Sequence, residues 1–112
     1  MAMLKRDDIM KCDDLPEAVV ECPEWGGEVK VKALSLDKRQ EISRASEVGN
    51  GLDSIKLAVV TFIEGVIEPK FTAADFEVLK SKSSSAMNRV VNKICELSGI
   101  GQDLKKELKA TD

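Results

Sequence analysis

The chain has 112 residues, enough for one domain, and its 43% hydrophobic and 33% charged residues suit a globular fold with a solvated surface. Its 17 basic and 20 acidic residues are interspersed and give a net charge of −3, so no basic stripe is available to bind nucleic acid. Histidine is absent and the three cysteines are widely spaced, a pattern that argues against a zinc site and favours reduced thiols in a cytosolic compartment.

Residues 1–16 carry mixed charges with little periodicity, and we expect a flexible N-terminal arm with one helical turn near residues 7–10. The start of the chain lacks the apolar region of a secretory signal. The longest apolar stretch, residues 57–67, is interrupted by Glu64 and Gly65 and is too short to span a bilayer. We therefore expect a soluble intracellular protein that does not contact membranes.

Residues 17–34 predict a β-hairpin. Two segments with alternating apolar and polar residues flank a turn that contains Gly26 and Gly27, which can adopt positive φ angles. Val29 and Val31 lie on the apolar face of the second strand. Because an isolated hairpin is marginal in water, this face must pack on helices or join the sheet of another copy.

Trp25, the only tryptophan, lies in the turn of this hairpin. Two interpretations are open. The ring either folds back over the helices as part of the core, or stays exposed as a contact residue. The second alternative has physical support because tryptophan is enriched among the residues that dominate binding energies at interfaces.

Helical signals follow the hairpin. Ser35 is a suitable N-cap for a helix over residues 36–48, which we expect to end in a left-handed cap at Gly49-Asn50-Gly51. A second, nearly apolar helix is predicted over residues 52–66, and Pro69 prevents its continuation.

Two further helices complete the pattern. Thr72 and Asp75 have the spacing of a capping box and open a short helix that ends near Lys82. Residues 83–97 form the last helix, with the strongest apolar periodicity in the chain, and Ser98-Gly99 ends it.

The prediction is an α+β fold, in which an N-terminal β-hairpin packs on a small bundle of about four α-helices. One domain covers residues 17–100, with the hairpin over 17–34 and the helices over 35–98. Residues 101–112 form a polar C-terminal tail with Leu104 and Leu108 at i,i+4 spacing, which we expect to become ordered only on a partner.

No constellation for a reaction is present. Without histidine the common nucleophilic triads are missing, and Ser83-Ser84-Ser85 lies where a helix begins and is interpreted as its cap. The acid pairs Asp7-Asp8 and Asp13-Asp14 lack the glycine-bearing loop of a calcium site. We therefore predict a non-enzyme with no catalytic, cofactor-binding or metal-binding residues.

Six short segments, taken in order and at their spacing, resemble the small tail assembly chaperones of bacteriophages and prophages with long, non-contractile tails. The resemblance covers nearly the whole chain. Its segments are residues 4–9, LKRDDI; 23–31, PEWGGEVKV; 34–39, LSLDKR; 71–75, FTAAD; 79–83, LKSKS; and 97–100, LSGI.

The resemblance implies a protein of the bacterial host cytoplasm that coats the long, helical, aggregation-prone tape measure protein. It would do so until the major tail protein, a further candidate partner, polymerises around that client, and it would be absent from the mature virion. The alternative is a minor structural tail or connector protein that stays in the virion. We expect a homo-oligomer formed through the hairpin, and the candidate interaction residues are Trp25, Val29, Val31, Leu104 and Leu108.

Overall fold

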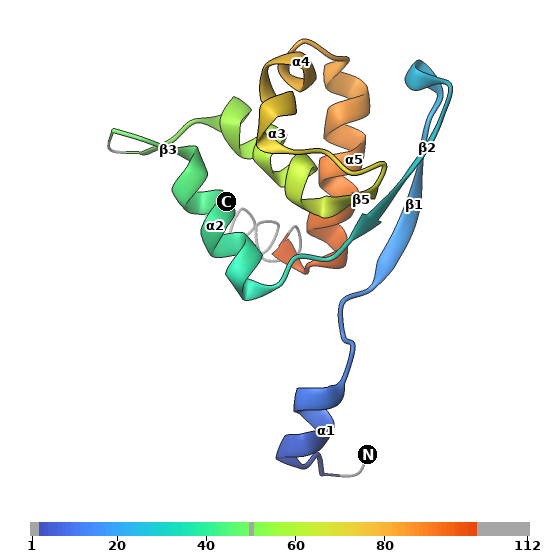
Figure 1. Ribbon diagram of the computed structural model, residues 1–112, viewed down its shortest axis with the longest axis vertical. Helices are drawn as coiled ribbons and strands as arrows, with labels where there is room; N and C mark the ends of the chain where they lie inside the picture. The colour runs from blue at the N-terminus through green and yellow to red at the C-terminus, as the bar shows by residue number, and fades with distance from the viewer. Residues whose placement is uncertain (1–2, 50, 101–112) are drawn as a thin grey trace, which may run out of the picture.

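The computed structural model describes residues 3–49 and 51–100 and confirms the α+β fold (Figure 1). In these residues a three-stranded antiparallel sheet begins with an N-terminal hairpin, and its inner face is covered by helices. The strand order is β1-β2-β5, so β1 and β5 are the two edges of the sheet.

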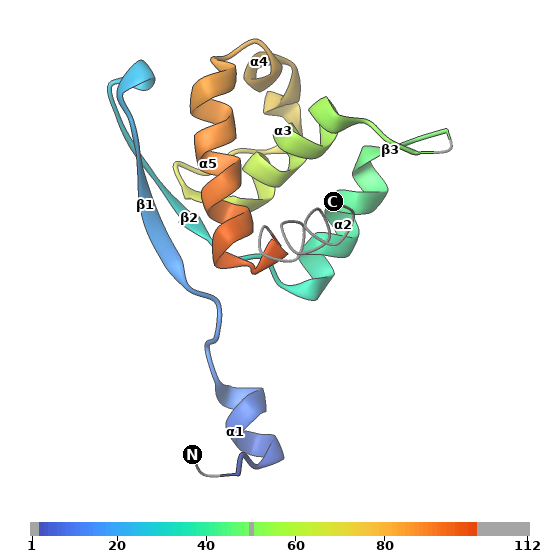
Figure 2. The same cartoon turned by 180° about the vertical axis from the view of Figure 1, so that it is seen from behind.

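The arm that precedes the sheet contains the short helix α1, Arg6–Lys11, as the sequence predicts. None of its residues is buried, and Figures 1 and 2 show it projecting away from the rest of the fold. The backbone N–H of Lys5 donates to the Asp8 carboxylate at 3.1 Å, which closes the first turn of this helix.

The hairpin consists of β1, Glu17–Cys22, the 3-10 turn η1, Pro23–Trp25, and β2, Gly27–Lys32. Gly26 has a φ of +75°, the left-handed conformation that glycine adopts without a steric cost. The register places Val20 opposite Val29 on the face that the helices cover. The predicted hairpin is thus confirmed, with its apolar face packed on helices of the same chain.

A third strand, β5, Val66–Glu68, pairs antiparallel with β2 and was not predicted. The pairing is irregular between Lys30 and Val31. The strand has only three residues and follows a helix directly, so no period-two pattern marks it in the sequence. Its first residue, Val66, continues the apolar run of that helix, which is why the sequence pattern placed it in the helix.

Three helices build the body of the domain: α2, Leu36–Ser46, α3, Ser54–Gly65, and α5, Ser84–Leu97. α3 packs against both of the others, and α5 also packs against β1 and β2. α5 therefore lies between the hairpin and α3 (Figure 2).

The predicted end of α2 is wrong. The helix ends at Ser46, and the next residues form a small hairpin of two-residue strands, β3, Glu47–Val48, and β4, Gly51–Leu52. The positive φ of Gly49, +55°, belongs to the turn of this hairpin and does not cap a helix. A glycine with positive φ serves either structure equally well, so composition alone does not separate the two.

Most of the predicted helix caps are confirmed. Ser35 accepts a hydrogen bond from the Lys38 N–H at 3.3 Å, and Ser83 accepts one from the Ala86 N–H at 3.3 Å. The Thr72 N–H donates to the Asp75 carboxylate at 2.9 Å and completes the capping box. This box begins a 3-10 turn, η2, and then the short helix α4, which cover Ala73–Asp75 and Phe76–Lys80.

The core lies between the inner face of the sheet and the three long helices. Phe62 of α3 is at its centre and is fully buried, and the Phe71 ring packs on it with 5.3 Å between ring centroids. The other fully buried large side chains come from α5, β2 and β5 and are aliphatic: Ile94, Val31, Val66 and Val90.

Candidate functional site

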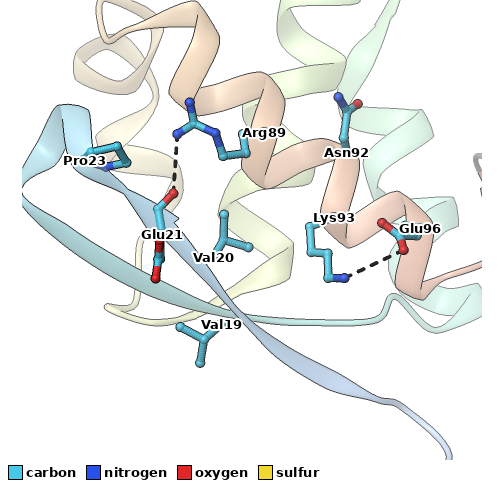
Figure 3. Close-up of a pocket in the computed structure, with 8 residues that line it drawn as sticks. All are labelled: Val19, Val20, Glu21, Pro23, Arg89, Asn92, Lys93 and Glu96. Carbon is cyan, nitrogen blue, oxygen red and sulfur yellow. Dashed lines mark hydrogen bonds and ion pairs between the residues drawn. The ribbon is translucent and has the colours of Figure 1, made fainter.

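An open groove of about 660 Å³ separates the outer edge of β1 from one side of α5. Figure 3 shows Arg89 and Lys93 of α5 on the side of that helix that faces the strand. Val20 lies on the α5 side of the strand and Val19 on the opposite side. The groove is lined by Val19, Val20, Glu21, Pro23, Arg89, Asn92, Lys93 and Glu96.

Alternate residues of β1 direct their backbone N–H and C=O groups away from β2, toward the outer edge of the sheet. The Ala33 N–H donates to the Pro16 carbonyl at 2.9 Å. Because hydrogen-bonded pairs alternate along an antiparallel ladder, the even-numbered residues of β1 are the ones that bond to β2. The N–H and C=O groups of Glu17, Val19 and Glu21 therefore point away from β2. Within the described residues these groups have no backbone partner, so β1 is an open edge.

Arg89 of α5 holds the hairpin tip against the helix. Its guanidinium donates two hydrogen bonds to the Glu24 carboxylate, at 2.8 and 2.9 Å, and a longer one to the Glu21 carbonyl at 3.4 Å. The hydrogen bonds from Arg89 lower the pKa of Glu24 from 4.5 to about 2. The same contact raises the pKa of Arg89. The outward carbonyl of Glu21 is therefore partly occupied, whereas those of Glu17 and Val19 are open.

The outer face of the hairpin has an uneven distribution of charge. Glu17 forms an ion pair with Lys30 at 3.1 Å, which neutralises one end. At the other end Glu21 lies directly opposite Glu28, and neither carboxylate has an ion-pair partner in residues 3–49 and 51–100. Between the two ends lies Val19, an apolar side chain that is 55% exposed.

Trp25 combines the two interpretations that its sequence left open. Its ring meets the buried Phe62 ring edge to face, with 5.9 Å between centroids and an interplanar angle of 88°, so it folds back over the helices. Yet 36% of the residue remains exposed. A second, smaller groove of about 220 Å³ lies between Trp25, Phe71 and α4. Trp25 thus covers the core and also lines a surface groove.

The other predicted interaction residues divide into two groups. Val29 and Val31 are only 7% and 0% exposed, because both point from β2 into the core. Their prediction as contact residues is therefore wrong for the folded domain, in which a partner cannot reach them. Leu104 and Leu108 lie outside the described residues, and their prediction is untested.

The buried thiols and the acidic side chains of the described residues show no arrangement for catalysis or metal binding. Burial raises the pKa of the Cys22 and Cys95 thiols, which makes them poor nucleophiles at neutral pH. Within the part of the chain that the structure describes, no three cysteine, aspartate or glutamate side chains gather as metal ligands would.

Sequence reasoning missed the residues that shape the groove. Val19 and Glu21 carried a usable signal, since an apolar residue next to a glutamate on the polar face of a strand is unusual. Arg89 carried none, because its partner Glu24 is 65 residues away and only the packing of α5 on β1 brings them together.

No protein-family description, curated protein or solved structure matches the chain. None of the helices in the described residues combines the length and the apolar character that a membrane span requires.

Proposed function

We propose that this chain is a phage tail assembly chaperone that acts in the host cytoplasm. It binds the tape measure protein, keeps it soluble during tail morphogenesis and leaves before the virion is complete. The ordered resemblance of six sequence segments supports the family, and the hairpin with its Trp-Gly-Gly turn is the most specific of them. The interspersed charges of the whole chain suit a protein that must stay soluble at high copy number.

The observation that carries the proposal is the open edge of β1 beside α5. A strand edge with outward N–H and C=O groups can pair with a strand from another chain. The adjoining groove gives room for the side chains of that added strand. The Trp25 groove offers a second, apolar contact on the same end of the hairpin. These features serve binding to another protein and need no catalytic group.

Co-expression with the tape measure protein tests this function. We expect the tape measure protein to move from the insoluble to the soluble fraction and to co-purify with this chain. An unrelated small acidic domain expressed at the same level is the control for a general effect on solubility. A client that stays insoluble and never co-purifies contradicts the proposal.

The major tail protein is the competitor in this scheme. If it displaces the chaperone, adding it to the purified complex should release this chain from the client. Size-exclusion chromatography followed by gel analysis measures that release. A complex in which all three proteins remain together would favour the alternative, a minor tail or connector protein that stays in the virion.

A further inference from the structure

The edge of β1 has the hydrogen-bonding groups of an incomplete sheet. The outward N–H and C=O groups of Glu17 and Val19, together with the N–H of Glu21, form a short ladder without a strand beside it in the described residues. Natural edges are often blocked by proline or covered by a loop. Here the strand itself contains no proline, and its edge opens onto the groove in Figure 3.

The charges along this edge define what a neighbouring strand should carry. Glu21 and Glu28 lie opposite each other, and like charges in that position are destabilising unless a cation lies nearby. On the same face Val19 presents an apolar surface, and Glu17 is already paired with Lys30. A complementary strand therefore places a lysine or arginine beside Glu21 and an apolar residue beside Val19.

The wall of the groove adds little net charge. Arg89 forms an ion pair with Glu24, and the Lys93 Nζ atom lies 3.7 Å from the carboxylate of Glu96 on the same helix. Asn92, which is exposed between them, offers an amide that can donate and accept hydrogen bonds. Side chains that point from an added strand toward α5 are therefore expected to be short and polar.

A second copy of β1 fits this edge poorly. Two copies related by a two-fold axis pair antiparallel, and a register centred on Val19 brings Glu17 of one copy opposite Glu21 of the other, twice. Shifting the register by two residues places Val19 opposite a glutamate instead. The charges of the strand thus work against pairing with itself and favour a different, basic strand.

We propose that the β1 edge beside α5 is a strand-addition site for an extended segment of the client chain, with a basic residue beside Glu21 and an apolar residue beside Val19. The inference rests on the proposed chaperone function for the identity of the client. It assigns the client segment a conformation and a charge pattern, which the chaperone function alone does not.

Two synthetic peptides test the site. The first is acetyl-Thr-Lys-Thr-Val-Thr-Lys-Thr-amide, whose central valine and flanking lysines match the edge in either strand direction, and the second has glutamates in place of the lysines. We expect the lysine peptide to shift the backbone amide NMR signals of Glu17, Val19 and Glu21. The glutamate peptide should bind about fivefold more weakly.

Two variants of the edge and one control variant separate edge pairing from a general charge effect. Val19→Pro removes an outward N–H without breaking a bond to β2, so it should abolish binding while the protein stays folded. Glu21→Lys should reverse the preference and bind the glutamate peptide more tightly. Glu41→Lys makes the same charge change on an exposed residue of α2 and should leave the preference of the wild type. Circular dichroism confirms the fold of each variant, and Glu21→Lys decides the matter if Val19→Pro fails to fold.

The proposal is overturned if neither peptide shifts the edge amides, or if Glu21→Lys keeps the wild-type preference. Edge amides that shift with protein concentration in the absence of peptide would assign the edge to a second copy and also overturn it. Its failure is distinct from that of the chaperone function. If the client stays soluble although the wild-type protein binds no peptide, only the strand-addition site is refuted. If the peptide binds but the client stays insoluble, the chaperone function is refuted.

Discussion

Arg89 shows how one side chain fixes the hairpin on the helices. Its guanidinium meets the Glu24 carboxylate with two hydrogen bonds of 2.8 and 2.9 Å, in the planar geometry that suits this pair. The same side chain reaches the Glu21 carbonyl at the edge of β1. The position of the hairpin tip, and with it the width of the groove, therefore depends on this contact.

The low pKa of Glu24 makes the contact dependent on pH. Because the pKa falls from 4.5 to about 2 on folding, the contribution of Glu24 to stability is complete above pH 4.5 and is lost as the pH falls toward 2. The variant Glu24→Gln lacks this contribution at every pH. We expect urea unfolding to show the wild type more stable than the variant at pH 7, with a smaller difference at pH 2.5. An equal difference at both pH values would contradict the ion pair.

Trp25 both covers the core and lines a surface groove. Its ring packs on Phe62, so truncation removes core cover as well as surface. We expect Trp25→Ala to lower the free energy of unfolding by about 2 kcal/mol, less than for a fully buried ring because part of it is exposed. Chemical denaturation measures this change, and an unaltered midpoint would show that the ring does not pack in solution.

At the scale of elements, α3 and α5 lie close together where Gly65 meets Ile94. A Cβ atom built on Gly65 would lie 2.7 Å from Ile94 Cγ1, and Ile94 is itself fully buried. We expect Gly65→Ala to destabilise the domain by about 1–3 kcal/mol through overpacking. Gly27→Ala is the matched control, since its Cβ would meet no atom within 4 Å. Equal stability of the two variants in thermal unfolding would contradict the close approach of the helices.

The elements also show how far sequence reasoning reaches. The caps at Ser35 and Ser83, the hairpin and the apolar stripe of α5 follow from local chemistry and were predicted correctly. β5 is a short strand that only pairing with β2 creates, so no local pattern marks it. The groove depends on the packing of α5 beside β1, and this contact joins residues that are far apart in the sequence.

The sequence pattern does not show which face of the hairpin contacts a partner. Val29 and Val31 were predicted to be contact residues because they form the apolar face of a strand. An alternating pattern, however, does not show whether that face packs on the protein's own helices or on a partner. In the fold they serve the core, and the polar face of β1 carries the exposed Val19. The candidate contact surface thus lies on the edge and outer face of the hairpin.

The whole molecule combines a packed core with one incomplete sheet. The body of helices covers one face of the sheet, and the outer edge of β1 remains free for a neighbouring strand in the described part of the chain. A domain of this size buries a limited share of its surface, so a partner strand would add stability as well as function. This open edge is the feature on which the proposed binding of a second chain rests.

As the proposed chaperone, the chain accompanies the tape measure protein and then leaves. Quantitative mass spectrometry of tail assembly intermediates and of purified virions from one infection tests both parts together. We predict peptides of this chain in intermediates that contain the tape measure protein, and none in mature particles. A constant ratio of this chain to the tape measure protein in finished virions would contradict the chaperone function and identify the chain as a structural tail component.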